Sequence, residues 1–124
     1  MLNNRIDSVQ GIHYWSNPSV SSWLRAISKA RFVVTDSYHG MLFSIIFRRQ
    51  FAIIPAHKKR FVRIGEFLES LGLEKRVCWD CEDLYKNDWD SMTIDFDYIF
   101  ANIIKSRREE SMAFLKSALA APIE

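Results

Sequence analysis

Five consecutive residues, Asp36-Ser37-Tyr38-His39-Gly40, are of types that could build a chemical site, and they interrupt an apolar run from Phe32 to Phe47. A carboxylate, a hydroxyl, an imidazole and a glycine at one turn can bind an anion or move a proton. The apolar flanks predict that the turn joins a buried strand to a buried helix. Ser37 would cap that helix, His39 would lie in its first turn, and Gly40 would let a ligand approach the backbone closely.

A second polar segment, His57 to Arg63, is basic and follows the next apolar stretch. Open parallel sheets bind ligands beyond the carboxyl ends of their strands, so the two segments are predicted to lie at one edge. A helix start also attracts anions. The sequence therefore predicts a site for a phosphate or a carboxylate, with Arg60 and Arg63 among its residues. In the alternative interpretation, the turn is purely structural and the basic segment is a solvated loop.

Alternating helices and strands must position these segments. We expect helices over 16–29, 37–47, 62–73 and about 95–120, and strands over 31–36, 51–55 and 76–79. In the first helix, Ser16 or Asn17 would be the cap and Val20 would begin the buried face. This order predicts an α/β fold in which a Rossmann-like parallel sheet has flanking helices. The whole chain, residues 1–124, is interpreted as a single α/β domain.

The composition excludes several classes of protein. The chain has 124 residues, 48% of them hydrophobic, which suffices for one packed core. A formal net charge of +2 argues against a nucleic-acid partner. The apolar runs are too short to span a bilayer, and the first residues lack the apolar core of a signal peptide. With only two cysteines, the sequence indicates a reducing cytoplasm.

Two other kinds of chemistry are disfavoured by spacing. Ser37 and His39 are two positions apart, so on a helix their side chains would point about 200° apart and could not form a nucleophile–base pair. Cys78 and Cys81 have the CxxC spacing, but no second ligand pair accompanies them, so we expect no metal site. Arg48 and Arg49, at the end of the buried helix, are interpreted as structural complements of its dipole.

Three stretches share their order and motifs with one known family. AISKARFVVTDSYHGMLFSIIFRRQFAII contains a strand, a D-S-[FY]-H-G turn and an apolar helix. FVRIGEFLESLGLEKRV contains an R-I…L-x-x-L-G-L segment, and IDFDYIFANIIKSRREESMAFLKSAL has the form of a terminal helix. Together these stretches resemble the polysaccharide pyruvyl transferase family, from about Pro18 onward.

The resemblance implies an enzyme that transfers a pyruvate ketal from phosphoenolpyruvate to a sugar of a capsule, exopolysaccharide or cell-wall polymer. It implies His39 as the catalytic residue, Ser37 and Gly40 as its matching neighbours, and Arg63 as the match of the family's helix-start arginine. Tyr38 stands where phenylalanine is also common. The implied fold is the C-terminal lobe of a two-lobed, GT-B-type enzyme, so a missing N-terminal lobe would be a partner, and this fragment alone is expected to be inactive.

The remaining expectations concern partners and alternatives. The donor would be phosphoenolpyruvate with no cofactor, and the acceptor a sugar or lipid-linked oligosaccharide, met in the cytoplasm or at the inner face of the membrane. A homo-oligomer is compatible with the sequence. His39 would be either a proton donor or a cationic contact. The alternatives are a non-catalytic binding lobe of the same fold and a GT-B glycosyltransferase lobe that uses a nucleotide sugar.

Overall fold

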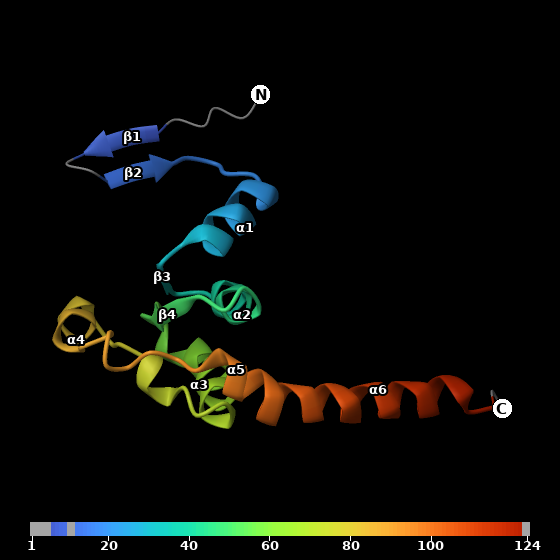
Figure 1. The fold of residues 1–124 in the computed structure, drawn as a ribbon. Helices are drawn as coiled ribbons and strands as arrows, with labels where there is room; N and C mark the ends of the chain where they lie inside the picture. The colour runs from blue at the N-terminus through green and yellow to red at the C-terminus, as the bar shows by residue number, and fades with distance from the viewer. Residues whose placement is uncertain (1–5, 10–11, 123–124) are drawn as a thin grey trace.

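A computed structural model describes residues 6–9 and 12–122 of the chain. Figure 1 shows the order and arrangement of its elements. The strands are β1 (Ile6–Val9), β2 (Ile12–Trp15), β3 (Phe32–Thr35) and β4 (Gln50–Ile53). The helices are α1 (Val20–Lys29), α2 (Tyr38–Ile46), α3 (Lys58–Ser70), the 3-10 turn η1 (Glu74–Arg76), α4 (Cys81–Lys86), α5 (Phe96–Ile99), the π-helical segment η2 (Phe100–Ile104) and α6 (Lys105–Ala120).

The centre of the fold is a parallel pair of strands, β3 and β4, joined by α2. Phe51, Ala52 and Ile53 of β4 are fully buried. Their uninterrupted apolar sequence is typical of a strand covered on both faces. The core around them includes Met41 of α2 and Leu68 of α3. The predicted mixed α/β class is therefore confirmed as a small parallel sheet with flanking helices.

The third strand predicted at 76–79 is reduced to one parallel bridge, between Val77 and Ile53. The amide of Cys78 donates to the carbonyl of Ile53 at 2.7 Å, so the segment does follow the edge of β4. It cannot extend because Arg76 ends the 3-10 turn before it and Asp80 caps α4 after it. The prediction of a third strand is therefore wrong in extent but right in place and direction.

The first helix begins later than predicted. Ser19 caps α1 by accepting the amide hydrogen of Ser22 at 3.1 Å, whereas Asn17 adopts a left-handed φ of 56° before the helix. Val20 is 74% exposed, so the prediction that it begins the buried face is wrong. The aromatic ring of Trp23 packs edge-on against Phe43, and this contact joins α1 to α2.

The C-terminal helical segment is confirmed, and Arg48 anchors its start. The guanidinium of Arg48 forms an ion pair with Asp97 and lies 4.3 Å from the ring centroid of Phe100. Arg48 is therefore structural, as predicted, although it acts through the ion pair and the aromatic contact and was predicted to act through the helix dipole. Beyond η2, α6 projects away from the remaining elements (Figure 1), and all its residues are exposed. Within the described residues, no helix is both long and apolar enough to cross a membrane.

Two elements of the fold were not predicted from the sequence. Strands β1 and β2 form an antiparallel hairpin in which Ile6 pairs with Trp15. The short helix α4 follows the Val77 bridge, and Asp80 caps it by accepting the amide hydrogen of Asp83 at 2.8 Å. Neither element supplies the parallel strands that position the candidate site.

Candidate functional site

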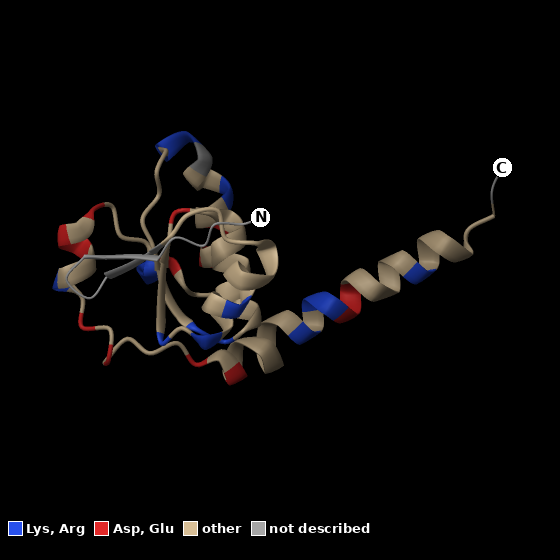
Figure 2. Cartoon of the chain, turned by 90° about the horizontal axis from the view of Figure 1, so that it is seen from above, with Lys and Arg blue, Asp and Glu red and all other residues tan. Residues whose placement is uncertain are grey.

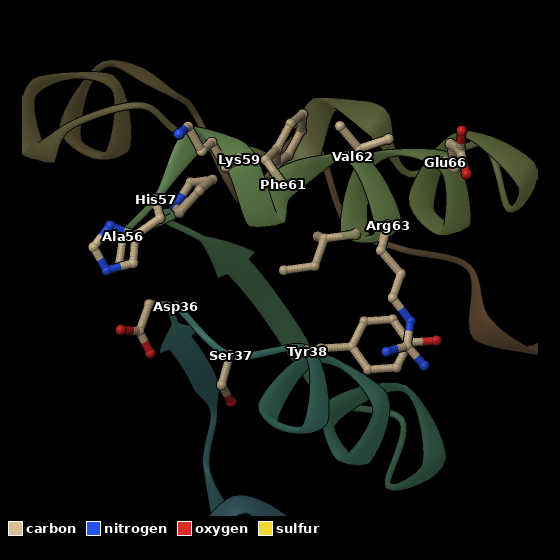
Figure 3. A pocket seen from close by; sticks show the side chains of 12 residues that line it. Asp36, Ser37, Tyr38, Ala56, His57, Lys59, Phe61, Val62, Arg63 and Glu66 are labelled. Atoms are coloured by element: carbon tan, nitrogen blue, oxygen red, sulfur yellow. The ribbon is translucent and has the colours of Figure 1, made fainter.

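A cleft of about 680 Å³ lies at the carboxyl ends of β3 and β4 (Figure 3). Its walls come from the starts of α2 and α3, which face one another across it. This is the edge at which the sequence placed both polar segments, and the parallel pairing of β3 with β4 brings them together. The lining residues are Asp36, Ser37, Tyr38, Pro55, Ala56, His57, Lys59, Phe61, Val62, Arg63, Ile64 and Glu66.

Ser37 is the N-cap of α2, as predicted. Its hydroxyl accepts the amide hydrogen of Gly40 at 2.9 Å, and the hydroxyl of Thr35 accepts the amide hydrogen of Ser37 at 3.2 Å. These two bonds fix the turn between β3 and α2. Because Ser37 also lines the cleft, its side chain connects the local fold to the candidate site.

Close packing at the start of α2 requires a glycine at position 40, and the sequence did not reveal this requirement. A Cβ atom on this residue would lie 2.3 Å from the hydroxyl oxygen of Thr35 and 2.9 Å from that of Ser37. The residue is buried, and its amide already donates to Ser37. The glycine therefore allows α2 to begin close to the end of β3. Its role in ligand binding stays a prediction.

The two histidines at this edge differ in position. His39 lies in the first turn of α2, as predicted, and it is exposed, but it is not among the residues that line the cleft. His57 is the residue before α3 and does line the cleft. Figure 3 shows its imidazole on the same side of the cleft mouth as Asp36. The geometry thus adds His57 to His39 as a candidate proton donor or anion contact.

Arg63 and Tyr38 face each other across the cleft. The Cζ atom of Arg63 lies 4.5 Å from the ring centroid of Tyr38, and that ring contacts Phe67 edge-on. The guanidinium is held over an aromatic face, with no ion pair to any described carboxylate. It remains available to an anionic ligand. Arg60 belongs to α3, but its side chain lies outside the part of the chain that the structure describes.

The electrostatics at the start of α3 favour an anion. The sequence predicts a polar segment at His57–Arg63 and a helix from Val62, whereas α3 begins at Lys58. Its first turn has no acidic residue, and its N-cap makes no side-chain capping bond. Figure 2 shows basic residues at this helix start. Cations oppose the helix dipole there, so the uncapped amides and the lysines would both gain from a bound anion.

Asp36 and Lys59, which belong to the two predicted polar segments, both line the cleft, whereas the carboxylate of Glu66 was not predicted there. Lys59, Arg63 and Glu66 are spaced i, i+4, i+7, so they share one face of α3. That spacing would have identified them if the helix had been predicted to start at Lys58. Asp36 and Glu66 place two carboxylates at the cleft in addition to its cations, and one of them could accept a proton from a reacting hydroxyl.

The CxxC pair contains one buried and one exposed thiol. Burial is the main reason that the pKa of Cys78 is raised, with a smaller contribution from the charge of Asp83. Cys81 is exposed in the first turn of α4, and both cysteines are free. Among the described residues, no group of three or more histidine, cysteine or acidic side chains could hold a metal ion.

Fold and cleft together define a mixed α/β structure with basic and acidic side chains at the carboxyl edge of a parallel strand pair. Residues 4–57 match the family model of polysaccharide pyruvyl transferase, which confirms the family resemblance noted in the sequence. The match includes the Asp36–Gly40 turn and extends to His57. No curated protein and no solved structure matches the chain. The match covers less than half of the 124 residues, and the matched family is one of transferases.

Proposed function

We propose that this chain is the donor-binding part of a polysaccharide pyruvyl transferase that uses phosphoenolpyruvate and forms a pyruvate ketal on a sugar. One observation carries the proposal: the turn that begins at Asp36 lies within the family match and lines the cleft. The same cleft is lined by His57, the last matched residue, and by Lys59 and Arg63 beyond the match. Phosphoenolpyruvate carries a phosphate and a carboxylate, and such anions are bound by cationic side chains and helix starts. The rest of the proposal, a GT-B-type C-terminal lobe acting in the cytoplasm, follows from the family resemblance.

The proposed reaction proceeds by addition and elimination at C2 of phosphoenolpyruvate. A proton added to C3 makes C2 electrophilic, and one sugar hydroxyl attacks C2 and loses its proton. The C2–O bond to phosphate then breaks, and a second hydroxyl of the same sugar attacks C2 and loses its proton. The products are the ketal and inorganic phosphate. Each step develops charge that fixed cations can stabilise, and each proton transfer needs an acid or a base.

The cleft residues supply these roles. Arg63 and Lys59 would bind the phosphate and the carboxylate, and Ser37 would hold the start of α2 against the donor. His39 or His57 would donate the proton to C3, because an imidazole is the side chain best suited to proton transfer near neutral pH. Asp36 or Glu66 would accept the proton of the attacking hydroxyl.

Calorimetric titration of the chain with phosphoenolpyruvate and, separately, with uridine diphosphate tests the donor. We expect phosphoenolpyruvate to bind and Arg63→Ala to weaken that binding about tenfold or more, since a hydrogen bond to a charged group contributes about 1.5–3 kcal/mol. Arg108→Ala, on the projecting helix α6, is the matched control. Binding of uridine diphosphate alone would favour a glycosyltransferase lobe, and binding of neither compound would contradict the donor assignment.

A further inference from the structure

A second hollow, of about 450 Å³, adjoins the cleft and is built around Trp79. It shares Phe61, Val62 and Glu66 with the cleft, so the two hollows are neighbours along α3. The remaining lining residues are Gly65, Glu69, Glu74, Val77 and Trp79. Apart from Glu66, the proposed mechanism uses no residue of this hollow.

Trp79 is held at the edge of the sheet where the cleft lies. The Val77 bridge runs parallel to β4, and the chain leaves the sheet at Trp79 on the carboxyl side. The amide of Trp79 donates to a carboxylate oxygen of Asp83 at 3.1 Å, and its ring packs edge-on against Phe61 with 4.8 Å between centroids. The indole is thus fixed in position and yet remains 50% exposed.

Charge separates this hollow from the cleft. Three carboxylates line it, from Glu66, Glu69 and Glu74, and its lining contains no lysine, arginine or histidine. None of the three carboxylates forms a hydrogen bond or an ion pair with another described residue. A phosphate or carboxylate ligand would be repelled here, whereas a neutral ligand rich in hydroxyl groups would find charged acceptors.

We propose that the hollow beside Trp79 binds the ring of a neutral sugar, and that this sugar is the acceptor of the transfer. The apolar face of a pyranose would lie on the indole, because aromatic rings offer apolar area with little conformational entropy to lose. Its hydroxyl groups would donate to Glu69 and Glu74. The identity of the sugar as the acceptor rests on the proposed function, while the sugar site itself rests on this hollow alone.

The residues shared by the two hollows indicate which way the sugar would face. Glu66 lines both the hollow and the cleft. A sugar seated on Trp79 would therefore extend its hydroxyl groups toward a donor held by Lys59 and Arg63. The anionic donor and the neutral acceptor would each occupy the space whose charge suits it, and Glu66 would stand between them.

Nitrogen-15 NMR of the 124-residue chain tests the site through its four indole N–H groups. Trp79→Phe and Trp15→Phe assign the two relevant signals, and Trp15 is a matched control because it is 45% exposed. The probes are the methyl glycosides of glucose, galactose, mannose and N-acetylglucosamine. We expect at least one probe to shift the Trp79 signal saturably, with a Kd on the order of millimolar, and to leave Trp15 unchanged.

Glu69→Ala should weaken that binding about tenfold, because one charged acceptor is lost, whereas Glu109→Ala on α6 should not. Both sites are exposed helix positions, so both variants are expected to fold. If no probe shifts Trp79, or if Trp15 shifts equally, the sugar site is overturned.

Phosphoenolpyruvate added to the same samples distinguishes this inference from the proposed function. It should shift the signals of His57 and leave the sugar affinity at Trp79 intact. Donor binding without sugar binding would overturn the inference and leave the proposed function standing. Sugar binding at Trp79 without any donor effect would support the sugar site and contradict the donor assignment.

Discussion

The guanidinium of Arg63 lies over the ring of Tyr38, with 4.5 Å between its Cζ atom and the ring centroid. The two residues belong to α3 and α2, so the contact spans the cleft that both helices line. Figure 3 shows the overlap of the two side chains. The contact presents a cation to the cleft without neutralising its charge, which an ion pair with a carboxylate would do.

Replacing Tyr38 should therefore act on Arg63. Tyr38→Leu removes the aromatic face and should lower the free energy of unfolding by about 0.5–1 kcal/mol, the contribution of an exposed cation–π contact, and it should also weaken phosphoenolpyruvate binding. Tyr38→Phe keeps the face and should preserve both quantities. Urea denaturation and calorimetry measure them. If Tyr38→Phe and Tyr38→Leu weaken donor binding equally, the ring does not position Arg63.

The two histidines should differ in donor binding because only His57 lines the cleft. In the 124-residue chain, His57→Ala should weaken phosphoenolpyruvate binding several-fold and His39→Ala should change it little, as measured by calorimetry. In an active pyruvyl transferase that contains this chain, as proposed above, loss of the imidazole that donates the proton should lower turnover about a hundredfold or more. A fall of that size in His39→Ala but not in His57→Ala would assign the proton transfer to His39.

Gly40→Ala should destabilise the fold by about 1–3 kcal/mol, the usual range for overpacking. The added Cβ would lie 2.3 Å from the Thr35 hydroxyl oxygen, and both groups are held by the turn. Gly65→Ala is the control, because there the Cβ would meet only the Phe61 ring, at 2.9 Å, and a ring can move aside. Urea denaturation compares the two variants.

Thr35→Ala combined with Gly40→Ala should lose less stability than the sum of the single changes, since the clash would be relieved. A stable Gly40→Ala variant that fails to bind phosphoenolpyruvate would instead show that the glycine is needed for close approach of the ligand, as predicted from the sequence.

The elements that carry the cleft could be predicted because their signals are local. The β-branched run before Asp36 and the serine cap at Ser37 identified a strand, a turn and a helix start. The start of α3 could not be placed because no capping residue precedes Lys58, and a run of cations normally indicates a solvated surface. The hollow at Trp79 depends on a single bridge between Val77 and Ile53, and no sequence pattern reveals such a tertiary pairing.

Ser37 offers a way to separate stability from binding. Ser37→Ala should cost about 1 kcal/mol through the lost cap, and Ser19→Ala at the start of α1 should cost about the same. Ser37→Asp should keep α2 capped, because an aspartate caps well and suits the helix dipole. Its negative charge in the cleft should nevertheless weaken phosphoenolpyruvate binding. Thermal melting and calorimetry of these variants check both expectations, and unchanged donor affinity in Ser37→Asp would contradict the anion site.

The buried thiol of Cys78 should make stability depend on pH in the alkaline range. Burial raises its pKa in the folded chain, so the folded state holds the thiol proton more firmly than the unfolded state does. The resulting stabilisation is fully present below about 8.5, the pKa of an unfolded thiol, and is lost as the pH rises through the higher folded pKa. Urea denaturation between about pH 7 and pH 10 should show this decline. Cys78→Ala should remove this contribution to the decline, while Cys81→Ala, which changes only an exposed thiol, should retain it. The two variants losing stability in parallel across this range would show that Cys78 does not titrate with unfolding.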